Sequence, residues 1–353
     1  MTRLTLLTPR TPGAVAILQL HGDSVRSVLE QLTGKADWFA GRLRLSRFTG
    51  IDEGLAVLLP GASDTAQLMP HGGPRVVQRL IEHLVEQLGV TYDPTPGPRK
   101  LYPESKSEIE ADMLDAIARA ASPAAIDLLA AQPRRWRDLL AAPEQAAAQR
   151  SVLQQRSAVL DQLIHPPTVV VIGPANAGKS TLTNRLMGRS VSIVADLPGT
   201  TRDWVGGLVE LAGQSGAGIA VRWLDTPGLR DSSDPIEQRA IALAKRVISD
   251  ATVVVALRDP GQAWPDRAEL PRQPDLWVVN KIDKTEEDLG GATGSSADDP
   301  LRISAMHGTG VGALEDRVIH LLGLSDLEAT CWAFSPRLRA WCERKDDLQG
   351  YVD

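Results

Sequence analysis

Eight consecutive residues, GPANAGKS at positions 173–180, have the types and spacing of a loop that binds nucleotide phosphates, G-x-x-x-x-G-K-[ST]. In such a loop the glycines let backbone N–H groups wrap the phosphates, and the following helix adds its positive end. Lys179 would reach the β- and γ-phosphates, while the hydroxyl of Ser180 would bind Mg²⁺. The alternative is a glycine turn that binds nothing, which the predicted strand before the loop and the helix after it disfavour. The predicted nucleotide contacts here are Asn176, Ala177, Gly178, Lys179, Ser180 and Thr181.

The motif DTPG, which ends an apolar stretch, is the second candidate part of the site. Asp225 could hold Mg²⁺ through a water molecule, and the N–H of Gly228 would sense the γ-phosphate. Upstream, the segment ADLPGTTRD offers Thr200 and Thr201 to complete the Mg²⁺ shell, and we favour Thr201 for the metal. The alternative for both threonines is a plain turn.

Two short segments after predicted strands could read the base. NKID at 280–283 provides Asp283, whose carboxylate would accept from N1–H and the 2-amino group of guanine, a pair of donors that adenine lacks. Alone, NKID could be an ordinary strand-to-loop turn, but here it follows the phosphate loop and DTPG in order. The predicted base-binding residues are Asn280, Lys281, Asp283, Ser304 and Ala305. Together the motifs predict a GTP-binding switch domain.

The hydrolysis step needs a group that positions water. Many nucleotide switches place a glutamine after the glycine of D-x-x-G, but this sequence has Leu229 there, which cannot donate or accept a hydrogen bond. Glu237, near the start of the next helix, is the candidate; alternatively it only complements the positive helix N-terminus. No arginine is placed as a charge-stabilising finger, so a monovalent cation held by Asn176 is our hypothesis for that role. The predicted catalytic residues are Lys179, Gly228 and Glu237.

The composition is typical of a folded globular protein. The 353 residues are 43% hydrophobic and 23% charged, which excludes a disordered chain. No uninterrupted run of about 18 apolar residues is present to span a membrane. The formal net charge of −6 does not favour nucleic-acid binding over the whole surface. Cys331 and Cys342 are the only cysteines, so we expect no disulfide framework and a cytoplasmic setting.

The pattern of elements predicts an α/β chain: a P-loop GTPase domain with a doubly wound, mostly parallel sheet, an α+β N-terminal domain and a reduced helical region. Apolar runs at 168–172, 252–257 and 276–279 read as buried parallel strands. Strands are also predicted at 4–8, 14–20, 42–48, 54–59, 219–224 and 301–303, and helices at 24–32, from 74, and at 181–187. We expect domains at 1–98 (N-terminal), 99–165 (helical), 166–324 (GTPase) and 325–353 (C-terminal helical tail).

The motifs GPANAGKS, DLPGTTRD, DTPGLRDSSDPIE and NKID, in this order, resemble the GTPase domain of the MnmE (TrmE) family. The opening TPRTPGAVAILQLHG, the segment PHGGPRVVQRLIEHL and the helix EIEADMLDAIARA are also similar to that family. The sequence departs from the family pattern in several places, which include a short helical domain and a missing asparagine-bearing loop before the first helix. It is shorter, it has no C-x-G-K tail, and ASDTAQLMP replaces an acidic stretch before HGGP.

The resemblance implies a potassium-activated GTPase of tRNA wobble-uridine modification. Asn176 would be the K⁺ ligand with carbonyls of the loop around Thr200, and Glu237 stands at the family's spacing from DTPG for the catalytic glutamate. It also implies a homodimer, formed by N-terminal domains that bind a tetrahydrofolate derivative. The further partners that it implies are a flavoprotein and tRNA. The alternative hypothesis is a regulatory GTP-dependent switch that gates a protein partner without RNA-modification activity.

Overall fold

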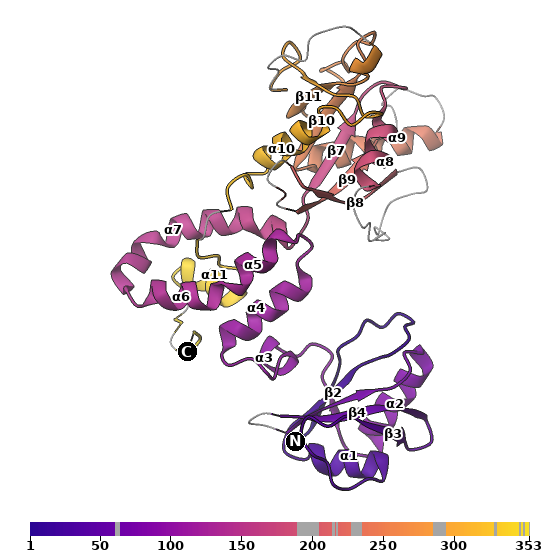
Figure 1. Cartoon of the computed structure of the whole chain (residues 1–353), viewed down its shortest axis with the longest axis vertical. Coiled ribbons are helices and arrows are strands. Elements are labelled where there is room, and N and C mark those ends of the chain that lie inside the picture. Colours follow the sequence, from indigo (N-terminus) through magenta and orange to yellow (C-terminus); the bar gives the residue numbers. More distant parts are fainter. Residues whose placement is uncertain are drawn as a thin grey trace. The chain divides into compact units, whose positions relative to one another are not determined.

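The computed structural model describes residues 1–60, 64–188, 205–213, 216, 218–226, 235–284, 294–327, 330–345, 347–348 and 350–352. The side chains of 205, 235–237, 239 and 240 lie outside this description. The chain forms two compact units (Figure 1). The first comprises Met1–Asp115 with Gln349–Asp353, and the second Ala116–Leu348.

The first unit is built on a six-stranded sheet of order β3-β4-β5-β2-β1-β6. Its neighbouring strands are antiparallel except for β1 and β6, which are parallel. Its elements are β1 (Arg3–Leu6), β2 (Leu18–His21), α1 (Val25–Thr33), β3 (Arg44–Phe48), β4 (Asp52–Leu59), β5 (Thr65–Met69), α2 (Pro74–Glu86), β6 (Thr91–Tyr92), α3 (Pro98–Leu101) and the start of α4 (Glu108–Arg119).

One face of this sheet carries the core of the unit. Alternate side chains of the strands, such as Leu18, Leu20 and Leu68, pack with α1 and α2 in one cluster. Helix α2 follows the Gly-Gly-Pro sequence because Pro74 has the φ angle of a first helical residue and no N–H to satisfy there. Leu80 and Leu84, one turn apart, then face the sheet and are fully buried.

The second unit contains a sheet of order β12-β11-β10-β7-β9-β8, parallel except at the β8–β9 pair. Its strands are β7 (Thr168–Ile172), β8 (Val205–Leu211), β9 (Ile219–Asp225), β10 (Val253–Arg258), β11 (Leu276–Val279) and β12 (Leu301–Arg302). Its helices are α8 (Lys179–Met187), α9 (Pro235–Asp250), η2 (Ile282–Lys284) and α10 (Val311–Leu321).

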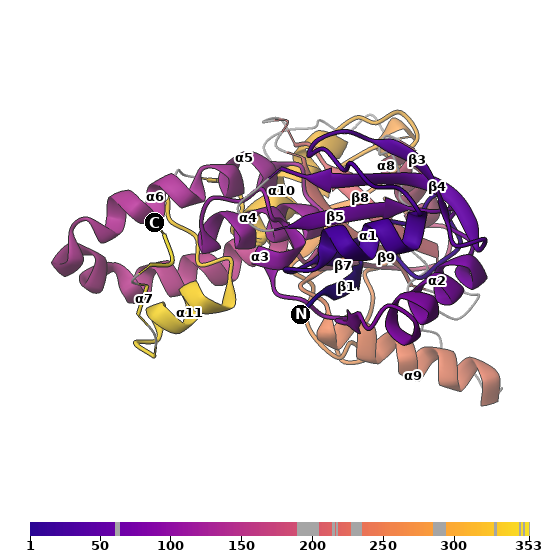
Figure 2. The same ribbon diagram turned by 90° about the horizontal axis from the view of Figure 1, so that it is seen from below.

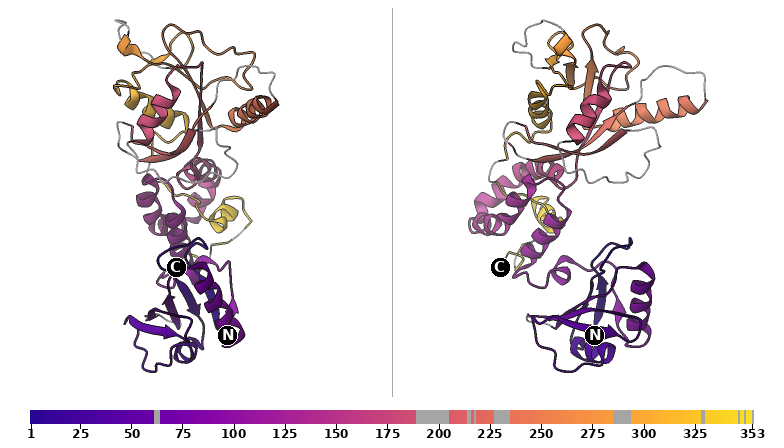
Figure 3. Two further views of the ribbon diagram at one scale, coloured as in Figure 1. Left: turned by 90° about the vertical axis from the view of Figure 1, so that its right-hand side faces the viewer. Right: turned by 45° about the vertical axis from the view of Figure 1, so that its right-hand side comes forward.

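Helices cover both faces of this sheet, which makes it doubly wound. On one face the indole of Trp223 donates to the Thr183 hydroxyl of α8 at 3.2 Å. On the other face Ile248 of α9 packs with Val170 and Ile172 of β7. Figure 3 shows α8 in magenta and α9 in salmon on different sides of the strands. The carboxyl ends of β7, β9, β10 and β11 therefore share one edge, where ligands of such sheets bind.

The helical part of the second unit joins residues far apart in sequence. It contains α5 (Ala124–Ala130), α6 (Gln132–Leu140), α7 (Pro143–Leu160), η1 (Asp161–Leu163) and α11 (Pro336–Cys342). Helix α11 lies beside α6 and α7 (Figure 1, Figure 2). The Trp136 and Trp341 rings meet edge to face at 5.4 Å, and the Trp136 indole donates to the Trp332 carbonyl. These three tryptophans thus have a packing role.

The predicted fold class is confirmed, with β7 and β11 matching their predicted bounds residue for residue. The predicted strand at 14–20 begins only at Leu18. Strands β5, β6 and β8 were not predicted. In the part of the chain that the structure describes, no helix has both the length and the apolar character needed to span a lipid bilayer.

Candidate active site

The predicted phosphate loop connects β7 to α8, and its shape depends on two glycines. At Gly173, with φ of +152°, a Cβ would lie 1.9 Å from the Leu257 carbonyl oxygen of β10. At Gly178, with φ of +95°, a Cβ would lie 2.2 Å from the Asn280 amide nitrogen. Only glycine allows both approaches. Asn176 adopts φ of +62°, a region that asparagine tolerates better than most residues, and it is exposed.

The centre of the site holds the predicted metal and phosphate ligands. The Ser180 hydroxyl donates to Oδ2 of Asp225 at 2.7 Å, so the two groups assigned to Mg²⁺ lie together. The Oδ1 atom of Asp225 is buried and finds no hydrogen-bond partner among the described residues. A buried carboxylate oxygen without a partner is costly, and a hydrated cation would satisfy it. The donor set therefore fits Mg²⁺.

Lys179 is only 9% exposed, and its ammonium donates to the Gly173 and Pro174 carbonyls at 3.1 Å each. Burial lowers the pKa of Lys179, and the nearby Asp225 partly opposes this. Burial likewise raises the pKa of Asp225, against the hydrogen bond from Ser180 and the charge of Lys179. Both groups are thus held in water-poor surroundings where their charges are poorly compensated, and a phosphate with Mg²⁺ would compensate both.

The base-binding segments are locked to the phosphate loop by one side chain. Asn280 is 2% exposed; its amide nitrogen donates to the Ala177 carbonyl at 2.9 Å, and its amide oxygen accepts from Ala305 N–H at 2.8 Å. Lys281 also reaches the loop, where its ammonium donates to the Asn176 carbonyl. The sequence motifs predicted that these residues contact the nucleotide. In the structure, Asn280 and Lys281 also hold the predicted contact segments together.

Asp283 lies in the short helix η2, beside the loop that follows β12. The Ser304 hydroxyl donates to its Oδ1 at 2.5 Å, and this hydrogen bond is the main reason that the pKa of Asp283 is lowered. His307 stands 4.0 Å from its Oδ2. Asp283 therefore remains an ionised acceptor, which is the state that a pair of donors on guanine requires.

Several predicted residues are outside this description. Thr200, Thr201 and Gly228 lie in segments that the structure does not describe, as does Leu229. Glu237 belongs to the first turn of α9, but its side chain is not described. The structure thus brings together the predicted residues at 176–181, 225, 280, 281, 283 and 304–305. The roles of the others stay predictions.

Comparison with known proteins places the chain in a family. The sequence model of the family described as "50S ribosome-binding GTPase" matches residues 168–287. The tRNA modification GTPase MnmE of Vibrio parahaemolyticus is 30% identical, over 92% of this chain and 83% of the relative. The MnmE of a Bradyrhizobium species is 31% identical, over 90% of this chain and 81% of the relative. The chain belongs to the MnmE family. A crystal structure of Aquifex aeolicus Era bound to GDP.AlF4- is 28% identical over 46% of this chain and 57% of that chain, with a TM-score of 0.33.

This MnmE-family protein is a GTPase, and its G domain contains contacts that the sequence motifs did not reveal. Asp259 and Gln262, in the loop after β10, reach Lys281 and the phosphate loop. A signal for them exists in the sequence, since they directly follow a buried strand whose carboxyl end lies at the ligand edge. His307, beside Asp283, has no comparable signal.

Proposed function

We propose that this protein is a Mg²⁺-dependent, K⁺-activated GTP hydrolase that acts in tRNA modification. The observation that carries the hydrolase part is the assembled centre of the G domain. There a buried lysine, a serine hydroxyl and an aspartate with an unsatisfied oxygen surround the predicted position of the phosphates and metal. The tRNA role is supported by relatives known as tRNA modification GTPases, which match about nine tenths of this chain.

In this proposal residues of the G domain hold the phosphates and the metal ions. Lys179 neutralises charge on the β- and γ-phosphates, and Ser180 with Asp225 holds Mg²⁺, which offsets negative charge as the terminal phosphate leaves. The exposed amide of Asn176 on its fixed backbone would bind K⁺ near the same phosphates, together with carbonyls around Thr200. Thr201 would complete the Mg²⁺ shell, Gly228 would sense the γ-phosphate, and Glu237 would orient the attacking water.

GTP turnover is expected to be at least about tenfold faster in KCl than in NaCl at equal ionic strength, because a bound cation offsets charge where no arginine does. The Glu237→Ala variant should lose the stimulated rate, since water is then no longer oriented. Steady-state phosphate release is the measurement. Asp250→Ala is the matched control, because it removes an exposed carboxylate at the other end of α9 and breaks only a surface ion pair.

Equal, slow turnover in both salts, unchanged in Glu237→Ala, would contradict the roles of Asn176 and Glu237. The regulatory switch would then be the better description. In the proposal, residues 166–324 are the GTPase domain and 1–98 the dimer-forming domain, with 99–165 and 325–353 as helical parts. A homodimer and a flavoprotein partner are included on the strength of the family resemblance.

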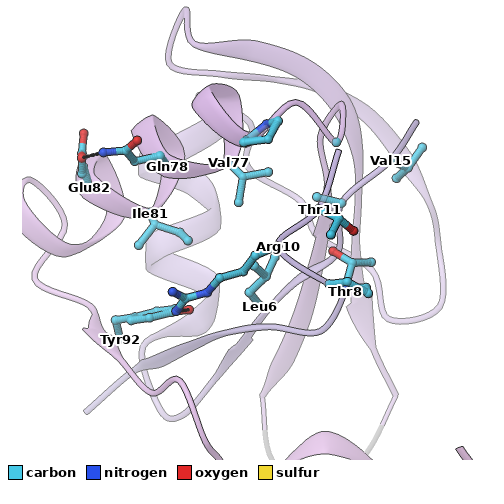
Figure 4. Close-up of a pocket in the computed structure, with 14 residues that line it drawn as sticks. Leu6, Thr8, Arg10, Thr11, Val15, Val77, Gln78, Ile81, Glu82 and Tyr92 are labelled. Atoms are coloured by element: carbon cyan, nitrogen blue, oxygen red, sulfur yellow. Dashed lines mark hydrogen bonds between the residues drawn. The ribbon is translucent and has the colours of Figure 1, made fainter. Parts of the chain in front are cut away.

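A second candidate activity, binding of a tetrahydrofolate derivative, is favoured by a cavity in the first unit. The cavity measures about 430 Å³, a size typical of small-molecule sites, and lies between α2 and the β1–β2 connection. Figure 4 shows apolar Val77 and Ile81 on its α2 side, with Arg10 extending toward Tyr92. Glu82, hydrogen-bonded to Gln78 at 2.8 Å, adds an acceptor.

This donor and acceptor set fits a folate. The pterin ring offers N–H donors that a carboxylate such as Glu82 can accept, its flat body suits the apolar wall, and its glutamate tail can pair with Arg10. We expect equilibrium dialysis to show binding of 5-formyltetrahydrofolate that weakens about tenfold in Arg10→Ala, the typical loss for one charged hydrogen bond. Arg47→Ala is the control, since Arg47 pairs with Glu53 outside the cavity lining. Equal binding by both variants would place the ligand elsewhere.

A further inference from the structure

The four residues after β10, Asp259 to Gln262, form a closed turn that we call the β10 loop. The Arg258 guanidinium donates to the carbonyls of Asp259, Pro260 and Gln262 at 3.2, 3.1 and 2.9 Å. It also stacks 4.7 Å from the Trp264 ring centroid. Within the turn, Oδ1 of Asp259 accepts from the Gly261 N–H at 3.0 Å. The β10 loop is therefore held in place by Arg258 and by a hydrogen bond within the turn.

Two side chains of the β10 loop extend from it to the nucleotide site. The Gln262 amide donates to the Ala175 carbonyl of the phosphate loop at 2.8 Å. The Oδ2 atom of Asp259 stands 3.1 Å from the ammonium of Lys281, and the two side chains are 22% and 26% exposed. Asp259 thus uses one oxygen to close the turn and the other to hold a lysine that the sequence assigns to base binding.

The held lysine lies beside the phosphate loop, next to the segment predicted to bind the base. Its ammonium is fixed between Asp259 and the Asn176 carbonyl, and its Cε is 3.9 Å from the position that a Cβ on Gly178 would take. The stem therefore runs along the phosphate loop, two residues before Asp283. We expect a nucleotide bound by both the loop and Asp283 to place its ring over this stem. Methylene groups of lysine cover flat apolar surfaces well while the ammonium stays paired.

We propose that Asp259 is a positioning residue for guanine-nucleotide binding, which fixes the Lys281 side chain in the conformation that supports the base. This inference deepens the proposed function and rests on the predicted roles of Lys281 and Asp283. A free lysine side chain has many rotamers, and it would lose that freedom on covering the base. The ion pair removes that freedom in the empty protein, so the nucleotide meets a surface that is already ordered.

The proposal predicts an effect on affinity without an effect on chemistry, because Asp259 contacts Lys281 and not the phosphate-binding lysine. In Asp259→Asn, which keeps the oxygen that closes the turn but loses the charge, the Kd for GDP and for GTP should rise about 3- to 10-fold, a coupling typical of contacting residues. KM for GTP should rise equally, with kcat retained. Fluorescence titration of the full chain with methylanthraniloyl-GDP and steady-state turnover are the measurements.

A double-mutant cycle with Lys281→Ala separates the possible failures. We expect the double variant Asp259→Asn/Lys281→Ala to bind no more weakly than Lys281→Ala alone, because the aspartate acts through the lysine. Asp266→Asn is the control, since Asp266 closes a similar turn by accepting from Ala268 N–H at 2.9 Å. Losses that multiply in the double variant, or a fall in kcat, would overturn the proposal and assign Asp259 a role in loop structure. If Lys281→Ala itself binds normally, the predicted role of Lys281 is wrong.

Discussion

The Asp283→Asn variant is expected to bind GTP at least about 100-fold more weakly than the wild type and to gain affinity for XTP, because sites built to hydrogen-bond one edge reject a mismatched one strongly. Guanine presents two donors, N1–H and the 2-amino group, and the ionised carboxylate accepts both. An asparagine presents one acceptor and one donor. Its donor would face the 2-amino group of guanine without a partner, whereas in xanthine it would meet the C2 carbonyl.

The environment of Asp283 makes this prediction sharp. Ser304 donates to one carboxylate oxygen and keeps the pKa of Asp283 low, so near neutral pH the group acts only as an acceptor. The ratio of kcat/KM for GTP to kcat/KM for XTP measures this change in base preference. Asp298→Asn is the control, because Asp298 is an exposed aspartate just before β12. Unchanged GTP preference in Asp283→Asn would mean that another group reads the base.

The second large effect is expected in Lys179→Ala, which should lower kcat/KM for GTP by about 1,000-fold or more, the loss typical of removing one charged group that stabilises a developing anion. In the empty protein its ammonium is buried against two carbonyls. When GTP binds, the phosphates replace those neutral partners with charged ones. Alanine leaves that negative charge uncompensated.

The stability of the empty protein should change in the opposite direction. Burial already lowers the pKa of Lys179, which means that the folded site disfavours its charge. Removing it should leave the melting temperature of the nucleotide-free variant at least as high as that of the wild type. The stabilisation by GTP with Mg²⁺ should disappear, because ligand stabilisation depends on affinity.

Thermal melts with and without nucleotide, together with turnover, test both effects in one series. Lys245→Ala on α9 is the matched control, since Lys245 is exposed. A variant that is inactive and also strongly destabilised would show that Lys179 supports the fold. A variant that retains turnover would remove Lys179 from the catalytic residues.

The parts of the fold that could be predicted are those whose residue pattern depends on local burial. Strands β7 and β11 are buried on both faces, so every position is apolar apart from the partly buried Thr168, and their bounds are visible in the sequence. Strand β8 lies at the sheet edge and contains Gly206 and Gly207, which weaken any strand pattern. Strand β6 has only two residues and depends on pairing with β1.

In the candidate site, too, some residues could be predicted from the sequence and others could not. Lys179, Asp225 and Asp283 stand in motifs whose chemistry is encoded by neighbours in the sequence. The contacts of Asp259 with Lys281, and of Asn280 with Ala305, join loops that are 22 and 25 residues apart. Such contacts exist only once parallel strands bring their carboxyl ends to one edge, so spacing along the chain could not indicate them.

The single amide of Asn280, which joins the Ala177 carbonyl to the Ala305 N–H, has a consequence for how the two ends of a nucleotide would bind. The segments predicted to bind the phosphates and the base are joined by these two hydrogen bonds, so we expect a ligand that binds one segment to find the other already aligned. A whole nucleotide should consequently gain a chelate advantage over guanosine and pyrophosphate offered as separate molecules. We then expect the nucleotide to dissociate in one concerted step, because an end that detaches rebinds quickly while the other end stays bound.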